Sequence, residues 1–104
     1  MVEISNNGAA SQWEAWLDGE LAGYAEYRSR PGRIVFTHTV VEPRFEGQGI
    51  GTGLAKAAVR DAIANGQRIL PVCPFIRAWL KRHPEHHEWV DWPPEKPTEG
   101  ADAA

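Results

Sequence analysis

The strongest constraint on the fold is a change of pattern near the middle of the sequence. Residues 33–41 (RIVFTHTVV) are rich in β-branched side chains, which is typical of a strand. Glycines then stand at alternate positions of a loop, at Gly47, Gly49 and Gly51. From residue 50 to residue 64 the apolar residues recur with a helical period. The pattern therefore predicts a strand, a glycine-rich loop and a helix in direct succession.

A second strand and a second helix follow. Residues 67–73 (QRILPVC) are short, apolar and bounded by turn signals, which favours a strand. Pro74 suits the first turn of a helix, and Pro84 requires that helix to end near residues 81–83. Because a helix that connects two strands is a crossover, the strands at 33–41 and 67–73 are expected to be parallel.

The first third of the chain has an antiparallel pattern. Residues 11–17 and 21–28 predict two strands joined by a turn at Asp18-Gly19, and residues 2–5 predict a further short strand followed by a loop over residues 6–10. The expected fold class is therefore mixed α/β (α+β). It comprises an antiparallel β-meander, one βαβ unit and a short C-terminal helix.

Length and composition limit the classes of protein that fit. The chain of 104 residues suits one domain, which we place at residues 1–92. Residues 93–104 are Pro-rich and acidic, so we expect a disordered tail. The net charge of −3 argues against a protein that coats nucleic acid or an anionic membrane. A single cysteine excludes an internal disulfide, and the lack of a signal-like or membrane-spanning segment favours a cytoplasmic protein.

The glycine loop has a chemical interpretation. Glycine lets the main chain approach a ligand closely, and the unpaired N–H groups at the start of a helix attract phosphate. The loop is not a P-loop, because no lysine follows its glycines, and it lacks the later glycine of a dinucleotide fingerprint, where Thr52 stands. A flexible turn without a ligand is the alternative interpretation.

Residues 40–62 (VVEPRFEGQGIGTGLAKAAVRDA) resemble motif A of the GNAT acetyltransferases, whose Q/R-x-x-G-x-G/A loop cradles the pyrophosphate of coenzyme A. The resemblance extends through residues 69–75 (ILPVCPF) and 82–85 (RHPE) to the short GNAT-like family, over about residues 13 to 90. Glu46 departs from the motif, which has Arg or Gln there, and we expect its carboxylate to point away from the phosphates. A second register, Gln48-x-x-Gly51-x-Gly53, also satisfies the motif.

The resemblance implies an acetyl-CoA-dependent N-acetyltransferase. Coenzyme A or acetyl-CoA is the implied cofactor, with its pantetheine arm between the two parallel strands and its pyrophosphate on the loop from Gly47 to Gly51. Lys81 and Arg82 are implied to reach its 3′-phosphate. The residues implied to bind it are Val40, Val41, Gly47, Gln48, Gly49, Ile50, Gly51, Thr52, Pro74, Lys81 and Arg82.

Two side chains are implied to act in catalysis. His38 is implied as the base that deprotonates the amine. Cys73 is implied either as the proton donor to the leaving thiolate or as a nucleophile that takes the acetyl group first. From the residues alone, Cys73 also fits a small buried hydrophobic position, and His38 also fits a structural hydrogen bond.

The histidines near the C-terminus have a spacing that a metal could use. His83 and His87 are four residues apart, but Pro84 disturbs a helix there and the HEXXH motif is absent, so we expect a structural role and no metal.

The acceptor is expected to be a small-molecule or peptide amine, and we expect no nucleic-acid or membrane partner. The second hypothesis is a non-catalytic module that binds coenzyme A or acyl-CoA, or that interacts with another protein. Its basis is that full GNAT enzymes build the acceptor site with N-terminal helices that this sequence does not show.

Overall fold

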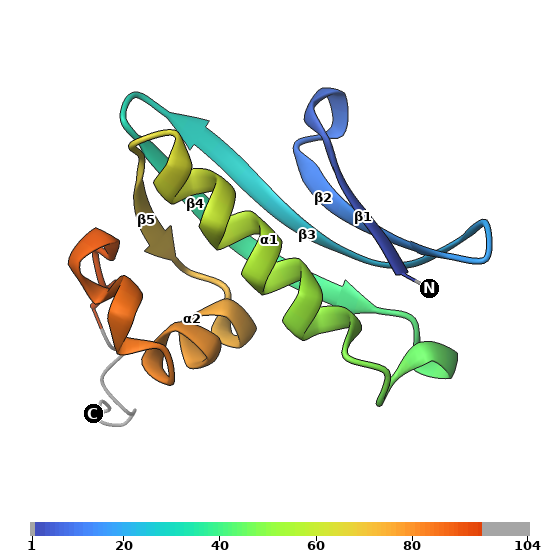
Figure 1. Ribbon diagram of the computed structural model, residues 1–104. Helices are drawn as coiled ribbons and strands as arrows, with labels where there is room; N and C mark the ends of the chain where they lie inside the picture. The colour runs from blue at the N-terminus through green and yellow to red at the C-terminus, as the bar shows by residue number, and fades with distance from the viewer. Residues whose placement is uncertain (1, 95–104) are drawn as a thin grey trace, which may run out of the picture.

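The computed structural model describes residues 2–94, which form a five-stranded sheet with two α-helices packed on it (Figure 1). The strands lie in sequence order across the sheet: β1 (Val2–Asn7), β2 (Gln12–Leu17), β3 (Glu20–Arg30), β4 (Arg33–Val41) and β5 (Arg68–Pro71). Neighbours from β1 to β4 are antiparallel, and β4 and β5 are parallel. α1 (Ile50–Ala64) joins the parallel strands, and α2 (Pro74–Lys81) follows β5. The mixed fold class predicted from the sequence is confirmed.

Several element boundaries differ from the sequence predictions, and β2 and β3 (predicted at 11–17 and 21–28) are among them. β1 extends to Asn7, whose side chain accepts a hydrogen bond from Ala10 N–H at 3.2 Å and so closes the 3-10 turn η1 (Gly8–Ala10) where a loop was predicted. β5 ends at Pro71, two residues earlier than predicted. Two further 3-10 helices, η2 (Pro43–Phe45) and η3 (Pro84–Trp89), were not predicted, and in both a proline occupies the first turn.

The residues predicted as one domain share one hydrophobic core, whose buried members run from Ala15 to Val90. Of the tail predicted over residues 93–104, residues 95–104 lie outside the residues that the structure describes. No helix within residues 2–94 combines the length and the apolar character needed to cross a membrane.

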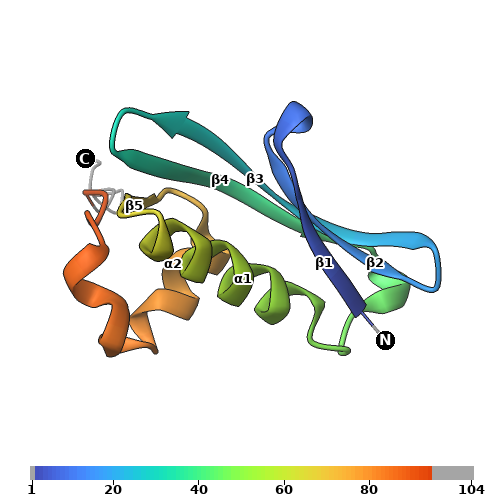
Figure 2. The same cartoon turned by 45° about the horizontal axis from the view of Figure 1, so that its top comes forward.

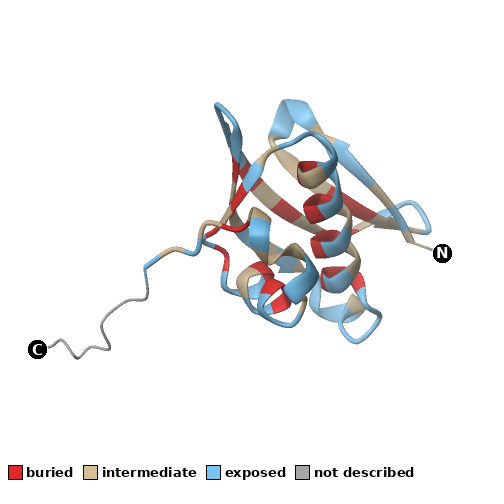
Figure 3. Cartoon of the chain, turned by 60° about the vertical axis from the view of Figure 1, so that its left-hand side comes forward, coloured by how far each residue is buried: buried red, intermediate tan, exposed pale blue. Residues whose placement is uncertain are grey.

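Both helices cover the same face of the sheet (Figure 2). The stripe that the helical period predicted is buried, because Ile50, Leu54, Ala58 and Ala62 each expose 2% of their surface or less. Figure 3 shows these buried positions recurring along α1. Phe36 of β4 is 1% exposed beneath them. The other face of the sheet carries no helix among residues 2–94, which matters for the site described below.

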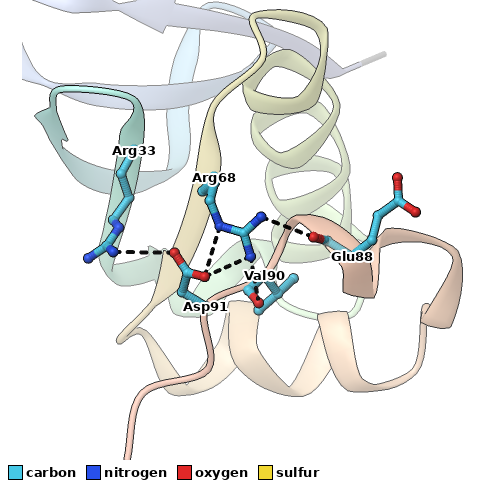
Figure 4. A network of polar contacts seen from close by, with 5 residues as sticks. All are labelled: Arg33, Arg68, Glu88, Val90 and Asp91. Carbon is cyan, nitrogen blue, oxygen red and sulfur yellow. Dashed lines mark hydrogen bonds and ion pairs between the residues drawn. The ribbon is translucent and has the colours of Figure 1, made fainter.

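A charged network holds the chain after α2 against β5 (Figure 4). Arg68 contacts the carboxylate of Asp91 with Nε at 2.9 Å and Nη2 at 2.7 Å, and Arg33 contacts it at 3.3 Å. Asp91 N–H donates to Ile69 O at 2.8 Å, beside a parallel bridge between Ile69 and Val90. The hydrogen bonds from Arg68 hold the pKa of the Asp91 carboxyl below its usual range. The network therefore fixes where the chain lies after η3.

We predict that Asp91→Asn lowers stability at neutral pH and that the loss disappears in acid. Because the folded-state pKa of Asp91 is lowered, its contribution is present above the unfolded-state value of about 3.8 and is lost as the pH falls through the folded-state value. Urea unfolding of both proteins at pH 7 and pH 3 measures the difference. Glu88→Gln is the control, because this carboxylate points away from the network (Figure 4). An equal loss at both pH values would contradict the prediction.

We also predict that Gly23→Ala destabilises the fold by about 1–3 kcal/mol. A Cβ at Gly23 would lie 2.7 Å from the carbonyl oxygen of Val40 and 3.3 Å from Val41 Cα, and main-chain atoms in the middle of a sheet cannot move aside cheaply. Gly8→Ala is the matched control, because nothing lies within 4 Å of a Cβ there. Thermal unfolding of the two variants compares them, and equal melting temperatures would refute the steric argument.

Candidate functional site

The two parallel strands separate after a short ladder, and this opens a fork in the sheet. The ladder ends at Pro71, which has no N–H to continue it. The last main-chain hydrogen bond between the two segments joins Cys73 N–H to Phe36 O at 2.8 Å. Beyond that link, residues 37–41 of β4 pair only with β3 within the described part of the chain. One edge of β4 is therefore free at the fork.

A bulge in β4 decides which side chains face the helices there. The pairing with β3 shifts by one residue at Thr37, opposite Glu26. Phe36 and Thr39 therefore lie on the helix-covered face, although an unbroken strand would place them on opposite faces. Thr37 and His38 lie on the other face, where both contact Glu26.

The main chain of Val41 points to the free edge. Glu42 N–H donates to Ala22 O of β3 at 2.8 Å, and the alternation along a strand then directs the polar groups of Val41 away from β3. The carbonyl of Val40 points toward β3, because its oxygen would lie 2.7 Å from a Cβ on Gly23. Val40 and Val41 were both expected to contact the pantetheine arm. Of the two, only Val41 has its main-chain N–H and C=O groups directed to the free edge.

A groove of about 400 Å³ lies where the free edge of β4 meets the start of α1. Thr39 and Val41 line it from β4, and Phe75 lines it from α2. Its other lining residues are Phe45, Glu46, Gly47, Gly49, Ile50, Gly51 and Thr52. Six of the residues implied to bind coenzyme A thus meet in one place, whereas five others do not line this groove: Val40, Gln48, Pro74, Lys81 and Arg82.

The glycine loop presents hydrogen-bond donors to this groove. Gly47 and Gly49 have φ angles of 84° and 77°, in the left-handed region that favours glycine. Gly49 is the N-cap of α1 and brings no side chain, so no side chain caps the first turn of the helix. Gly51 leaves room for Phe75, whose ring would lie 2.8 Å from a Cβ there. The positive end of the α1 dipole therefore opens onto the groove.

Glu46 lies beside the same groove. It is an exposed residue and one of those that line the groove. Within residues 2–94 its carboxylate has no hydrogen bond or ion pair. An unpaired carboxylate here opposes the binding of a phosphate by its charge.

Cys73 lies at the inner end of the fork. It is 1% exposed and is the N-cap of α2, where its sulfur accepts a hydrogen bond from Ile76 N–H at 3.5 Å. The hydroxyl of Thr39 lies 3.4 Å from the same sulfur. Because Thr39 also lines the groove, it connects the groove to the thiol.

His38 lies on the opposite face of the sheet from the groove. Its Nδ1 is 3.2 Å from Glu26 Oε1, and the edge of its ring meets Tyr24 at a centroid distance of 6.1 Å. The side chain is 50% exposed. The structure therefore does not place His38 and Cys73 in one cavity, but on the two sides of the fork.

Four residues of this site were not found from the sequence. Thr39, Phe45 and Phe75 line the groove, and Glu26 contacts His38. Thr39 could not be assigned because its orientation depends on the bulge at Thr37, and Glu26 could not be assigned because its pairing depends on the strand register.

The C-terminal histidines cap α2. His83 Nδ1 lies 2.6 Å from Trp79 O, and His87 Nε2 lies 2.7 Å from Leu80 O. These carbonyls belong to the last turn of the helix, and each also accepts a main-chain N–H, from Arg82 and His83 respectively. The structural role expected from the sequence matches this geometry. No group of three or more His, Cys, Asp or Glu side chains within residues 2–94 is arranged to hold a metal.

Comparison with known proteins agrees with this geometry. A family model described as GCN5-related N-acetyltransferase matches residues 12–89. The solution structure of a GCN5-like candidate N-acetyltransferase from Staphylococcus aureus is similar with a TM-score of 0.68 and 22% identity, over 93% of this chain and 95% of that one. No curated protein is similar enough to this chain to count as a match.

A second solved structure is similar over part of its length. It is the crystal structure of a candidate acetyltransferase of the GNAT family from Desulfovibrio desulfuricans, with a TM-score of 0.51 and 29% identity. The similar region covers 56% of this chain and 40% of that one.

The family match thus spans β2 to η3, including the fork, the glycine loop and both helices that form the groove. The resemblance expected from the sequence is confirmed. The chain belongs to the GCN5-related N-acetyltransferase (GNAT) family of acetyltransferases.

Proposed function

We propose that the protein binds acetyl-CoA in the groove beside α1 and transfers the acetyl group to an amine. The observation that carries the proposal is the uncapped start of α1, which opens beside the free edge of β4. A pyrophosphate takes main-chain donors at a helix start, and an extended arm with amide groups pairs with a free strand edge. Coenzyme A carries these two chemical groups next to each other.

In this arrangement the N–H groups of the α1 first turn, at Ile50, Gly51 and Thr52, hold the pyrophosphate. The main chain of Val41 pairs with the pantetheine arm. The arm then leads past Thr39 to Cys73, because Thr39 both lines the groove and contacts the thiol. Acetyl-CoA supplies a thioester whose acyl carbon an amine can attack.

Cys73 has two possible roles at the thioester. As an acid, it gives its S–H proton to the thiolate that leaves when the new C–N bond forms and the C–S bond breaks. As a nucleophile, its sulfur bonds to the acetyl carbon while the C–S bond of acetyl-CoA breaks, and coenzyme A leaves as a thiol with the Cys73 proton. The amine then attacks the acetyl group, its new C–N bond replaces the bond to Cys73, and the amine proton returns to the Cys73 sulfur. In both roles the sulfur becomes negatively charged at one step, and Ile76 N–H and the Thr39 hydroxyl can donate hydrogen bonds to it.

His38 suits a base that receives the proton of the amine from the opposite face of the sheet. Glu26 Oε1 lies 3.2 Å from Nδ1 and favours a proton there, which would leave Nε2 with a lone pair for the proton of the amine. At the fork the two faces of the sheet are connected through the gap between the strands, because β5 no longer pairs with the edge of β4 there. The amine therefore approaches from the His38 face, and acetyl-CoA from the Cys73 face.

A non-catalytic module that binds coenzyme A is the second candidate. One observation favours it: the two candidate catalytic residues lie on different faces of the sheet. The two candidates differ in turnover but not in binding.

We predict that the affinity for coenzyme A rises when a negative charge is removed from the glycine loop and falls when one is added. Calorimetric titration with coenzyme A and acetyl-CoA, with ATP and NAD as comparison ligands, should show selective binding. Glu46→Gln should tighten binding about three- to tenfold because it removes a repulsive charge, and Gly49→Asp should weaken it by at least as much.

Gly32→Asp is the matched control for this titration. Gly32 has a φ angle of 70°, close to that of Gly49, but it lies in the turn between β3 and β4 and not at the groove. An Asp there introduces the same backbone strain and charge, so binding should stay unchanged. No binding by the wild-type protein, or an equal loss in both Asp variants, would contradict the proposed site.

We predict that Cys73→Ala slows acetyl transfer by a factor of about 10²–10⁴ without weakening the binding of coenzyme A. Release of free coenzyme A thiol in the presence of a panel of amines measures transfer. Mass spectrometry after incubation with acetyl-CoA distinguishes the two roles of Cys73, because only the nucleophile acquires an acetyl group. Unchanged turnover in Cys73→Ala would exclude both roles, whereas binding without turnover in the wild type would establish the non-catalytic module.

A further inference from the structure

Negative charge without positive charge marks the N-terminal part of the sheet. Residues 1–27 contain no Lys or Arg, and their carboxylates are Glu3, Glu14, Asp18, Glu20 and Glu26. Glu20 is paired with Arg44, and Glu26 lies beside His38. The remaining three carboxylates have no cationic partner within residues 2–94. A surface of this kind attracts positively charged ligands.

Glu14 of β2 is the carboxylate that the structure holds most firmly. Strand alternation puts Ala15 in the core and Glu14 on the uncovered face of the sheet, where Glu14 is 9% exposed. Asn7 and Gln12 donate hydrogen bonds to its Oε2 at 2.9 and 2.7 Å, and Trp16 donates to its Oε1 at 3.2 Å. The hydrogen bond from Gln12, followed by that from Asn7, lowers the pKa of this carboxyl. Neutral donors therefore hold the charge in place, whereas buried charges are ordinarily paired with an opposite charge.

One acceptor site of Glu14 is left for a ligand. A carboxylate offers about four acceptor sites, and the three donors occupy both sites of Oε2 and one of Oε1. Tyr24 of β3 stands directly opposite Glu14, and its ring meets that of His38 at a centroid distance of 6.1 Å. Tyr24 therefore forms the surface between this carboxylate and the candidate base. An ammonium group is attracted both by a carboxylate and by an aromatic ring.

The strand order determines how far apart the two ends of this surface lie. His38 belongs to β4, Tyr24 to β3 and Glu14 to β2, and these strands are neighbours in the sheet. Neighbouring strands are about 4.8 Å apart, so His38 and Glu14 are separated by roughly 10 Å across the sheet, which is about the extended length of a seven-carbon diamine.

We propose that the acceptor is a linear aliphatic amine with a second ammonium group, which binds on the uncovered face against Glu14 and Tyr24 while the reacting amine lies at His38. The inference rests on the proposed function, because it takes the amine to approach from the His38 face. Charge complementarity selects this occupant, since β1 and β2 contain no Lys or Arg and the carboxylate of Glu14 lacks a counter-ion. An acceptor with a single amine leaves that charge unpaired.

The test compares three acceptors: diaminoheptane, heptylamine and diaminopropane. Release of free coenzyme A thiol gives kcat/KM for each. The wild-type protein should prefer diaminoheptane to heptylamine by about tenfold or more. Diaminopropane should lack this advantage, because its chain is too short to reach both His38 and Glu14.

Glu14→Gln should reduce the preference for diaminoheptane to about twofold or less. The loss should come from a higher KM for the diamine, with kcat within about twofold, because the second ammonium group binds but does not react. Asp18→Asn is the matched control. It also removes an unpaired carboxylate charge, but from the turn between β2 and β3, and it should keep the preference. Thermal unfolding establishes that both variants are folded.

A second measurement needs no variant. Between about 0.1 M and about 1 M salt the screening length falls from about 10 Å to about 3 Å. The wild-type kcat/KM for diaminoheptane should therefore fall over this range more steeply than that for heptylamine. Equal salt dependence of the two amines counts against the inference even where Glu14→Gln does not fold.

The outcomes separate this inference from the proposed function. If the wild type acetylates heptylamine or diaminopropane as efficiently as diaminoheptane, or if Asp18→Asn loses the preference as Glu14→Gln does, the inference is overturned and the proposed function stands. If the wild type acetylates no amine at all, acetyl transfer fails as the function and this inference fails with it.

Discussion

The site depends on the point at which β5 stops pairing with β4. Pro71 has no N–H to donate to the ladder, and the chain turns away from β4 after it. The last main-chain hydrogen bond between the two segments runs from Cys73 N–H to Phe36 O. If β5 continued for three more residues, it would cover the free edge of β4 and close the fork. The interrupted ladder therefore creates the free edge of β4 and brings the Cys73 thiol to the inner end of the fork. It also leaves a gap between β4 and the chain after β5 through which the two faces of the sheet are connected.

Charge along α1 complements this opening. The uncapped helix start attracts anions at the fork. Glu46 acts against that attraction from the edge of the groove.

The sequence predicted what depends on local patterns. β4 and α1 have the predicted bounds, since β-branched content and helical period are local signals. The bulge at Thr37 was not predictable, because it arises from pairing with β3, and it alone decides that Thr39 faces the groove and His38 does not.

The proposed function requires coenzyme A to occupy the groove at the fork. Backbone amide chemical-shift mapping of the isotope-labelled protein with coenzyme A detects where it binds. The largest shifts are expected at Thr39, Val41 and the first turn of α1, and none at the β1–β2 edge of the sheet. Shifts confined to the uncovered face of the sheet, or no shifts at all, would contradict it.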